Sequence, residues 1–251
     1  MNRIIRRCGL ALIAALAPSL ARGQAPPAPT VVRPAEATVT VGDLLVGVGA
    51  GAIILGNPSF SGTGVLGQVP LTASGRLSFK PGPAVTAFAS YEIIPHFGIE
   101  GQIGYSSINV DRFEGNLAAP GAGALNGAFP IKGHVGTIAG FTNAVFTPLT
   151  DRHQVFPYLG AGIGFTSSWV DLESVNVLGA AVPLGATSSR TSFAFDAFIG
   201  ADYRVSERGN IGLVYQFSRS NPSGLGSTDT FAAKTGALNA HLIAALFEYR
   251  F

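Results

Sequence analysis

Apolar and polar residues alternate along much of this chain, and the alternation is strictest in its last five residues. There the aromatic residues Phe247, Tyr249 and Phe251 alternate with Glu248 and Arg250. Successive side chains of a β-strand point to opposite sides, so a period of two predicts a strand with one apolar and one polar face. An exposed aromatic face is favoured where it meets lipid near a membrane rim. The pattern therefore predicts strands that face lipid on one side.

The same alternation predicts eight strands in all. They are Asp43–Leu55, Ala84–Ile94, Phe97–Asn109, Lys132–Phe146, Val155–Trp169, Thr191–Val205, Asn210–Ser220 and Ala237–Phe251. In the sixth and clearest of them, Phe193, Phe195 and Ile199 share one face, whereas Asp196 and Asp202 share the other. In a membrane-spanning barrel, the apolar face of each strand points to lipid and the polar face to the lumen.

The connections between the predicted strands alternate between short and long. The short ones are Pro95–His96, Pro148–Gln154 and Ser206–Gly209, and the long ones cover about 56–82, 111–131, 170–190 and 221–236. Outer-membrane barrels have short periplasmic turns and longer external loops, whereas a soluble barrel has no reason for this asymmetry. We therefore predict an all-β fold, an eight-stranded antiparallel up-and-down transmembrane barrel with short periplasmic turns and long external loops.

Composition supports a membrane protein that crosses with strands. The chain is 47% apolar and only 12% charged, whereas about a quarter of the residues are charged in an ordinary soluble domain. Beyond the N-terminal segment, no apolar run is long enough for a spanning helix, and the longest, Leu44–Leu55, has the length of a spanning strand. The net charge of +2, without a basic stripe, gives no indication of nucleic-acid binding.

The N-terminus has the three parts of a secretory signal. In residues 1–23, three arginines precede an apolar centre and a stretch of small residues suited to cleavage. We expect residues 24–42, rich in Pro and Ala, to form a periplasmic linker, and residues 43–251 to form the barrel. The single cysteine, Cys8, falls in the signal, so the mature chain is predicted to have neither disulfides nor thiol chemistry.

Over about residues 43–251, the chain resembles the small eight-stranded outer-membrane barrels of the OmpA/OmpX type. The segment Pro157–Phe165 is similar to a central strand motif of that group, and Tyr249–Phe251 is similar to its terminal assembly signal. The resemblance implies a Gram-negative outer-membrane location, in contact with outer-membrane lipid and lipopolysaccharide. It also implies the barrel-assembly machinery and periplasmic chaperones as partners. The residues assigned to the assembly signal are Phe247, Tyr249 and Phe251.

Charged residues on the predicted polar faces define a candidate lumen network. These are Glu92, Glu100, Lys132, His134, Asp196, Asp202, Arg204, Glu248 and Arg250. Because isolated buried charges are costly, we expect them to pair or to meet trapped water. An alternative is that some of them gate a narrow ion leak, since side chains just fill an eight-stranded barrel and no wide pore is expected. The glycine clusters 47–51 and 160–164 are interpreted as space for larger side chains on facing strands.

We predict no enzyme activity, although some small outer-membrane barrels hydrolyse or transfer lipid acyl chains. The segment Ser218-Arg219-Ser220-Asn221 resembles the His-x-Ser-Asn motif of lipid A deacylases, but Ser218 stands where that motif has its base. No catalytic residue and no cofactor site are therefore proposed. The His, Asp and Glu residues do not recur at metal-ligand spacing, so no metal site is predicted.

Three functional classes stay open at the level of sequence. The favoured one is a structural and surface-interaction protein that supports envelope integrity, adhesion or antigenicity, with external loops contacting host cells, phage or other cell surfaces. The second is a narrow channel or transporter for ions or small hydrophobic molecules. The third is a soluble, lipocalin-like carrier, which requires the apolar faces to point inward.

Overall fold

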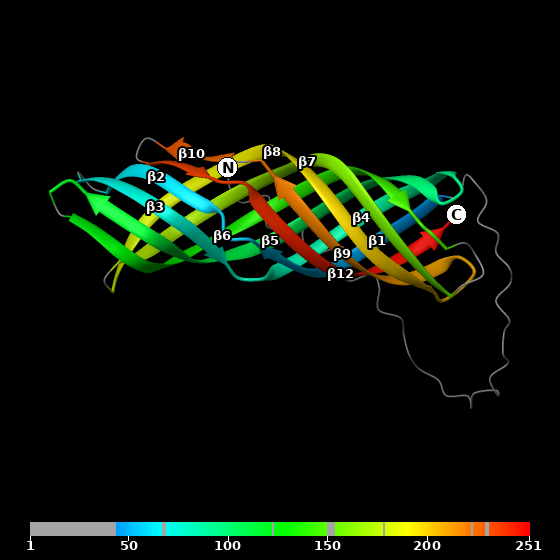
Figure 1. Cartoon of the computed structure of the whole chain (residues 1–251). Helices are drawn as coiled ribbons and strands as arrows, with labels where there is room; N and C mark the ends of the chain where they lie inside the picture. The colour runs from blue at the N-terminus through cyan, green and yellow to red at the C-terminus, as the bar shows by residue number, and fades with distance from the viewer. Residues whose placement is uncertain are drawn as a thin grey trace, which may run out of the picture. The chain divides into compact units, whose positions relative to one another are not determined.

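The computed structural model describes residues 44–251 apart from 67–68, 122, 150–153, 178, 222 and 229–230. The predicted signal and linker lie outside this range. The described part consists of β-strands joined by turns (Figure 1), and no helix in it is long and apolar enough to cross a membrane. The strands are β1 (Leu44–Leu55), β2 (Ser59–Leu66), β3 (Val69–Phe79), β4 (Gly82–Ile94), β5 (Phe97–Ala119), β6 (Gly123–Phe146), β7 (Val155–Val177), β8 (Ala180–Arg204), β9 (Gly209–Ser220), β10 (Ser223–Thr228), β11 (Phe231–Thr235) and β12 (Leu238–Arg250).

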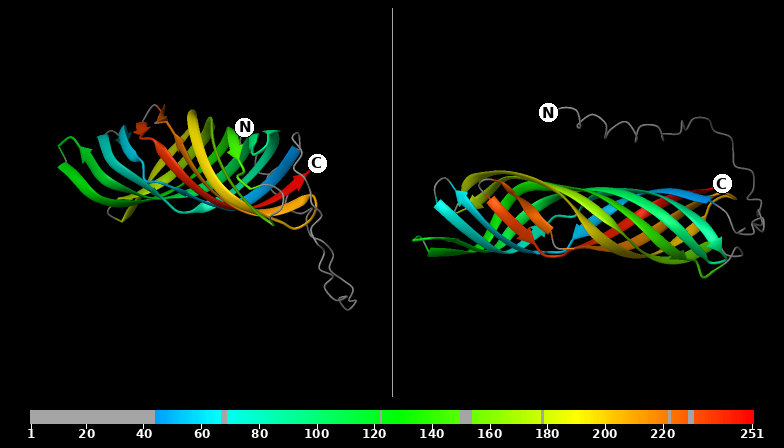
Figure 2. Two further views of the ribbon diagram at one scale, coloured as in Figure 1. Left: turned by 45° about the vertical axis from the view of Figure 1, so that its right-hand side comes forward. Right: turned by 90° about the horizontal axis from the view of Figure 1, so that it is seen from above.

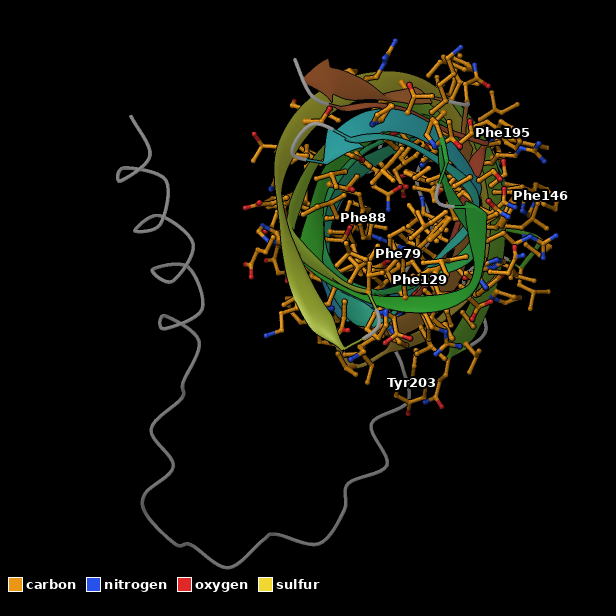
Figure 3. All side chains as sticks on the ribbon, turned by 90° about the vertical axis from the view of Figure 1, so that its left-hand side faces the viewer. Phe79, Phe88, Phe129, Phe146, Phe195 and Tyr203 are labelled. Atoms are coloured by element: carbon orange, nitrogen blue, oxygen red, sulfur yellow. The ribbon has the colours of Figure 1, made fainter. Side chains whose placement is uncertain are left out.

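Eight of these strands close into an antiparallel ring in the order β1, β4, β5, β6, β7, β8, β9, β12 and back to β1. Viewed along its axis, the ring encloses a lumen filled with side chains (Figure 3). The backbone amide of Phe251 donates to the carbonyl of Leu44 at 3.0 Å, so the two ends of the ring meet at the end that carries the short turns. The predicted eight-stranded barrel is confirmed.

The outward face of the ring carries many large apolar side chains. Ile163 is 61% exposed, Ile199 59% and Leu213 60%, values that water would make costly for large aliphatic side chains. Nearly all exposed large hydrophobic residues lie on or beside the eight ring strands. In the end-on view, Phe146, Phe195 and Tyr203 point away from the barrel (Figure 3). This belt matches the lipid-facing surface of a spanning barrel.

The four long connections are mostly β-structure, whereas the sequence predicted loops. β2 and β3 form a hairpin within 56–82, and β10 and β11 form one within 221–236. β5 and β6 pair up to Ala119 and Gly123, and β7 and β8 pair up to Val177 and Ala180. β3 also pairs with β5, and β2 with β11, so that these hairpins join into an extension beyond the ring (Figure 2).

The extension has the opposite polarity to the ring, with apolar side chains inside and charged ones outside. Its interior core is made by the buried residues Phe60, Leu77, Val110, Phe113, Phe129, Ile131, Val135 and Leu172. On its outer face, Arg112 makes ion pairs with Asp111 at 3.1 Å and Glu114 at 2.6 Å, and Lys80 pairs with Asp111 at 3.5 Å. The hydrogen bond to Glu114 raises the pKa of Arg112 further above its ordinary value. An outer face of this kind is suited to water.

The change of polarity coincides with irregularities in the strand pairing. The register shifts between Asn109 and Arg112 on β5, between Lys132 and Gly133 on β6, and between Leu172 and Ser174 on β7. Neighbouring strands thus carry their irregularities at one level, where the ring continues into the extension. Bulges are common at the rims of barrels because they bend and re-aim strands.

Glycines face aromatic rings across neighbouring strands. Gly47 pairs with Phe88, and Gly160 pairs with Phe198. A Cβ atom added at either glycine would overlap the ring of its partner. The interpretation of the glycine clusters as space for larger side chains is therefore confirmed at these positions. Phe88 and Phe198 then pack in a buried apolar cluster with Val214 and other residues inside the ring.

Candidate functional site

The lumen of the ring is the place where polar side chains gather. Glu100, Asp196, Asp202 and Glu248 all point inward, and each retains 8% or less of its exposed surface. They come from β5, β8 and β12, and strand alternation brings them inward because their neighbours in sequence face outward. The closed ring then holds carboxyl groups from distant parts of the sequence within one narrow interior.

A pair of glutamines crosses the middle of the lumen. The Gln102 amide donates to Gln216 Oε1 at 3.1 Å, and the Gln216 amide donates back to Gln102 Oε1 at 2.9 Å. Gln102 also donates to Thr86 Oγ1 at 3.1 Å, and Gln216 donates to Asp196 Oδ2. These bonds connect β4, β5, β8 and β9, so the glutamine pair and its two partners form a polar layer that spans the interior.

A second polar layer lies closer to the turn end. Asn143 donates to Glu100 Oε1 at 3.1 Å, and Asn210 donates to Glu248 Oε2 at 3.2 Å. The guanidinium of Arg204 lies 4.5 Å from the ring centroid of Phe156, a cation–π arrangement. Neutral amides therefore satisfy part of the hydrogen-bonding capacity of the buried carboxyl groups.

Several buried polar atoms have no hydrogen-bond partner among the protein atoms. They include the hydroxyl of Tyr158 and one oxygen each of Asn143, Asp196 and Asp202. Buried acceptors without partners cost about 1–3 kcal/mol each, so their concentration in one lumen is informative.

Three cavities follow one another along the lumen. The largest, of about 150 Å³, lies at the turn end, and two smaller ones of about 80 and 70 Å³ lie farther toward the extension. Thr86, Gln102 and Gln216 line both the first and the second cavity. The glutamine pair therefore stands between them. Leu55 and Thr166 line both the second and the third.

Most of the charged residues predicted for the lumen lie there. Glu92 and Arg250 line the cavity at the turn end, as do Glu100, Asp202 and Glu248. Asp196 is buried one layer farther in, and Arg204 stacks on a residue that lines the cavity. Their role as one functional network stays a prediction.

The placement predicted for Lys132 and His134 is wrong. Both belong to β6, where Ile131 and Val135 point inward and are buried, so Lys132 and His134 lie on the outward face. The prediction assumed that polar residues point inward along the whole strand. At this height β6 has left the apolar belt, and its outward face carries polar residues because it meets water.

Neutral polar residues are the part of the site that sequence reasoning did not single out. Gln102, Asn143, Asn210 and Gln216 make most of the hydrogen bonds in the lumen. The alternation of side chains could have found them. Each lies on the polar face of its strand, in some cases an even number of residues away from an acidic residue that points inward. Charge alone was too narrow a criterion.

The three residues assigned to a terminal assembly signal all face outward. Phe247 is 52% exposed, Tyr249 37% and Phe251 70%, and the rings of Tyr249 and Phe251 lie 5.0 Å apart in an edge-to-face contact. Phe247 and Tyr249 lie on the apolar face of β12 near the turn end, and Phe251 follows the last residue of the strand. Their role in assembly stays a prediction.

The arrangement shows no assembled hydrolytic site at the segment that resembles a deacylase motif. Ser218 and Ser220 line the second cavity, whereas His241 bonds to Tyr215 at 2.8 Å and is stacked against it. Among the described residues, no group of three or more His, Cys, Asp and Glu side chains is placed to hold a metal ion.

A closed ring of eight strands, an apolar outer belt and a polar lumen define a transmembrane β-barrel of the Gram-negative outer membrane. The chain belongs to the outer membrane protein β-barrel domain family, which it matches over residues 14–251. No curated protein matches the chain.

Solved structures of small outer-membrane proteins are similar to this chain at low sequence identity. Neisserial surface protein A is 17% identical, with 83% of this chain and 97% of that chain covered and a TM-score of 0.43. OprG from Pseudomonas aeruginosa is 14% identical, with 84% of this chain and 96% of that chain covered and a TM-score of 0.48. The attachment invasion locus protein Ail of Yersinia pestis, in complex with the heparin analogue sucrose octasulfate, is 14% identical. In this comparison 84% of this chain and 100% of that chain are covered, and the TM-score is 0.40.

Proposed function

We propose that this protein is a non-enzymatic surface protein of the outer membrane, in which the ring is the membrane anchor and the extension makes contacts outside the cell. The observation that carries this proposal is the apolar core inside the extension. Phe113 is 3% exposed and Leu77 5%, although both lie beyond the lipid belt. A core of its own gives the extension a fixed shape, as a recognition surface requires.

The paired strands support the same role. β5 to β8 each have 23 to 25 residues, whereas about 9–11 residues suffice to cross a bilayer. Much of the strand length beyond the ring is hydrogen-bonded to neighbouring strands. For example, β3 pairs with β5, and β7 pairs with β8. Partners on host cells, phage or other cell surfaces would meet this outer surface. Within the membrane, we expect contact with lipid and lipopolysaccharide, and assembly through the barrel-assembly machinery and periplasmic chaperones.

Replacing residues 112–130 by a short turn tests the proposal. The shortened protein should still show heat-modifiable migration on gels, because residues 97–111 of β5 and 131–146 of β6, which form their part of the ring, are kept. Cells that express it should lose adhesion to the surfaces that cells with the full chain bind, and both should be compared with a deletion strain. Equal adhesion of all three strains, together with unchanged envelope integrity in the deletion strain, would contradict a surface role.

A narrow channel is the second candidate, and the succession of cavities along the lumen favours it. Only the layer around Gln102 and Gln216 separates the first cavity from the second. Single-channel conductance in planar bilayers should rise when both glutamines are replaced by Ala. The variants Asp196→Ala and Arg204→Ala should alter any current that the native protein carries. Absence of current in the native protein and in all variants would exclude ion conduction.

A further inference from the structure

A groove of about 440 Å³ lies on the outward face of the ring, where β7, β8 and β9 are neighbours. The register of the strands sets its shape, because Ala201 on β8 lies directly between Pro157 on β7 and Leu213 on β9. The next outward row toward the extension holds three large side chains, those of Leu159, Ile199 and Tyr215. A small residue among large ones leaves a depression in the lipid-facing surface.

The wall of the groove is apolar. Among the described residues that line it there is no charged side chain. The hydroxyl of Tyr215 lies 2.8 Å from Nδ1 of His241 and is therefore already hydrogen-bonded. The hydroxyl of Tyr158 lies on the lumen side, where a Cβ atom added at Gly200 would overlap it. The side chains of the groove thus offer an occupant van der Waals contact and no polar anchor.

The position and size of the groove fit an acyl chain. The groove lies in the lipid-facing belt, where acyl chains are the surrounding solvent. Its volume is about three times that of a protein cavity that holds benzene, so it suits a stretch of alkyl chain. Leu213 and Ile199 stand out beside it, and Tyr203 points away from the barrel on the turn side (Figure 3). A chain seated there contacts protein on several sides, whereas a chain on a flat part of the belt contacts it on one.

A cation lies at the rim beside the groove. Arg208 is exposed in the turn between β8 and β9, and its side chain is hydrogen-bonded to Tyr249, which faces outward on β12. This bond holds the guanidinium at the outer rim of the barrel. Leu213 lies five residues after Arg208, about 17 Å along the strand and less along the membrane normal because barrel strands tilt. One leaflet is about 15 Å deep, so a lipid phosphate at Arg208 and an acyl chain in the groove are compatible.

We propose that this groove binds one anionic glycerophospholipid of the periplasmic leaflet, with an acyl chain in the groove and the phosphate at Arg208. A second copy of the chain is the competing occupant. Docked by two-fold symmetry through the same groove, it would bring two Arg208 side chains to the same level, and their like charges disfavour this arrangement. The site lies on the ring, so the proposal is independent of the surface role of the extension.

The test uses the full chain refolded in detergent micelles without lipid, with folding verified by heat-modifiable migration. After addition of palmitoyl-oleoyl phosphatidylglycerol, native mass spectrometry should show saturation at one bound lipid. Diacylglycerol with the same two acyl chains should bind about fivefold more weakly, because it lacks the phosphate that a cation near the membrane surface attracts. Glycerol 3-phosphate, which has the phosphate but no chains, should not bind. Equal binding of diacylglycerol, or a broad distribution of lipid numbers without saturation at one, would overturn the proposal.

Two pairs of variants locate the binding. Ala201→Phe should weaken phosphatidylglycerol binding by about tenfold, because the ring fills the groove and removes the contact area of the chain. Ala89→Phe is its matched control, since Ala89 is exposed on β4, outside this groove, and also precedes a tyrosine by two positions.

Arg208→Gln should weaken binding by about fivefold, whereas Glu207→Gln in the same exposed turn should not weaken it. This second pair decides the matter even if Ala201→Phe folds poorly. If Ala201→Phe and Arg208→Gln both bind like the native protein, the lipid lies elsewhere and the proposal fails. A native dimer that Ala201→Phe dissociates, with no lipid bound to the native protein, would assign the groove to a second copy and would also overturn it.

Discussion

Single residues in this barrel act through the space that they leave as much as through the contacts that they make. Gly160 lies beneath the ring of Phe198, and Gly200 lies beneath the ring of Tyr158 on the same pair of strands. The two aromatic rings then meet each other inside the lumen. Glycine is unfavourable in a strand by itself, so its value here is that it lets a large ring lie flat against the wall.

The substitution Gly160→Ala should therefore destabilise the folded barrel by about 1–3 kcal/mol, because the new methyl group displaces the ring of Phe198 from a packed cluster. Urea titration of the folded fraction, followed by heat-modifiable migration, measures the change. Gly101→Ala is the matched control, since a Cβ there meets no atom within 4 Å. Similar destabilisation by both variants would mean that strand propensity, and not the ring, decides the effect.

The lipid-facing side allows an equally direct residue-scale prediction. Ile199, on the outward face of the part of β8 that pairs with β9, is 59% exposed. Ile199→Arg should lower the free energy of unfolding in lipid vesicles by about 2–4 kcal/mol, whereas Ile199→Leu should leave it nearly unchanged. If the arginine variant is as stable as the native protein in vesicles, the outward face at this height does not contact acyl chains.

At the scale of elements, the sequence predicted the membrane-spanning parts well because lipid imposes a simple rule on them. β5 begins at Phe97 and β9 ends at Ser220, as the alternation predicted. The continuation of β5 to Ala119 was missed. Beyond the membrane, outward residues need only tolerate water. The sequence Gly-Asn-Leu-Ala-Ala at 115–119 has no regular alternation of apolar and polar residues that would reveal a strand.

The candidate site was predicted only in part, for a related reason. The alternation of apolar and polar residues correctly predicted that Asp196 and Glu248 point inward, because both lie within the lipid belt. It failed at Lys132, which lies where the outside is water. The bond between Gln102 and Gln216 could not be predicted, because it joins strands separated by 114 positions and depends on how the ring closes.

The core of the extension gives a prediction at the scale of elements. Phe113→Ala should loosen the hairpins by removing a ring that contacts Phe60 at 5.5 Å and Phe129 at 6.1 Å between centroids, a loss of about 3–5 kcal/mol at a well-packed site. Protease added to intact cells should then cleave the extension faster than in the native protein. The ring should remain resistant and heat-modifiable. Leu125→Ala, at an exposed position on β6, is the control and should not change the cleavage rate.

At the scale of the whole molecule, the two faces of each ring strand should differ in access to lipid. The barrel residues 43–251 contain no cysteine, so single-cysteine variants report one position each. Leu213→Cys should react with a membrane-partitioned thiol reagent, because Leu213 is 60% exposed on the outward face. Val214→Cys, its inward neighbour with 7% exposure, should stay unlabelled. The reverse result would mean that the apolar face is inside.

The reversal of polarity between ring and extension has a consequence for how deeply the molecule is immersed. A shift of the barrel out of the membrane, toward the extension, would bring exposed side chains such as Ile103 and Ile163 into water. A shift in the opposite direction would bury Arg112 and Lys132 in the bilayer. Each submerged cation costs about 2–4 kcal/mol near the midplane and less near the interface, and several strands contribute at once. Vertical drift is therefore resisted in both directions. The distance from the bilayer to the tips of the hairpins is consequently a fixed property of the chain, which sets how far from the cell this surface is displayed.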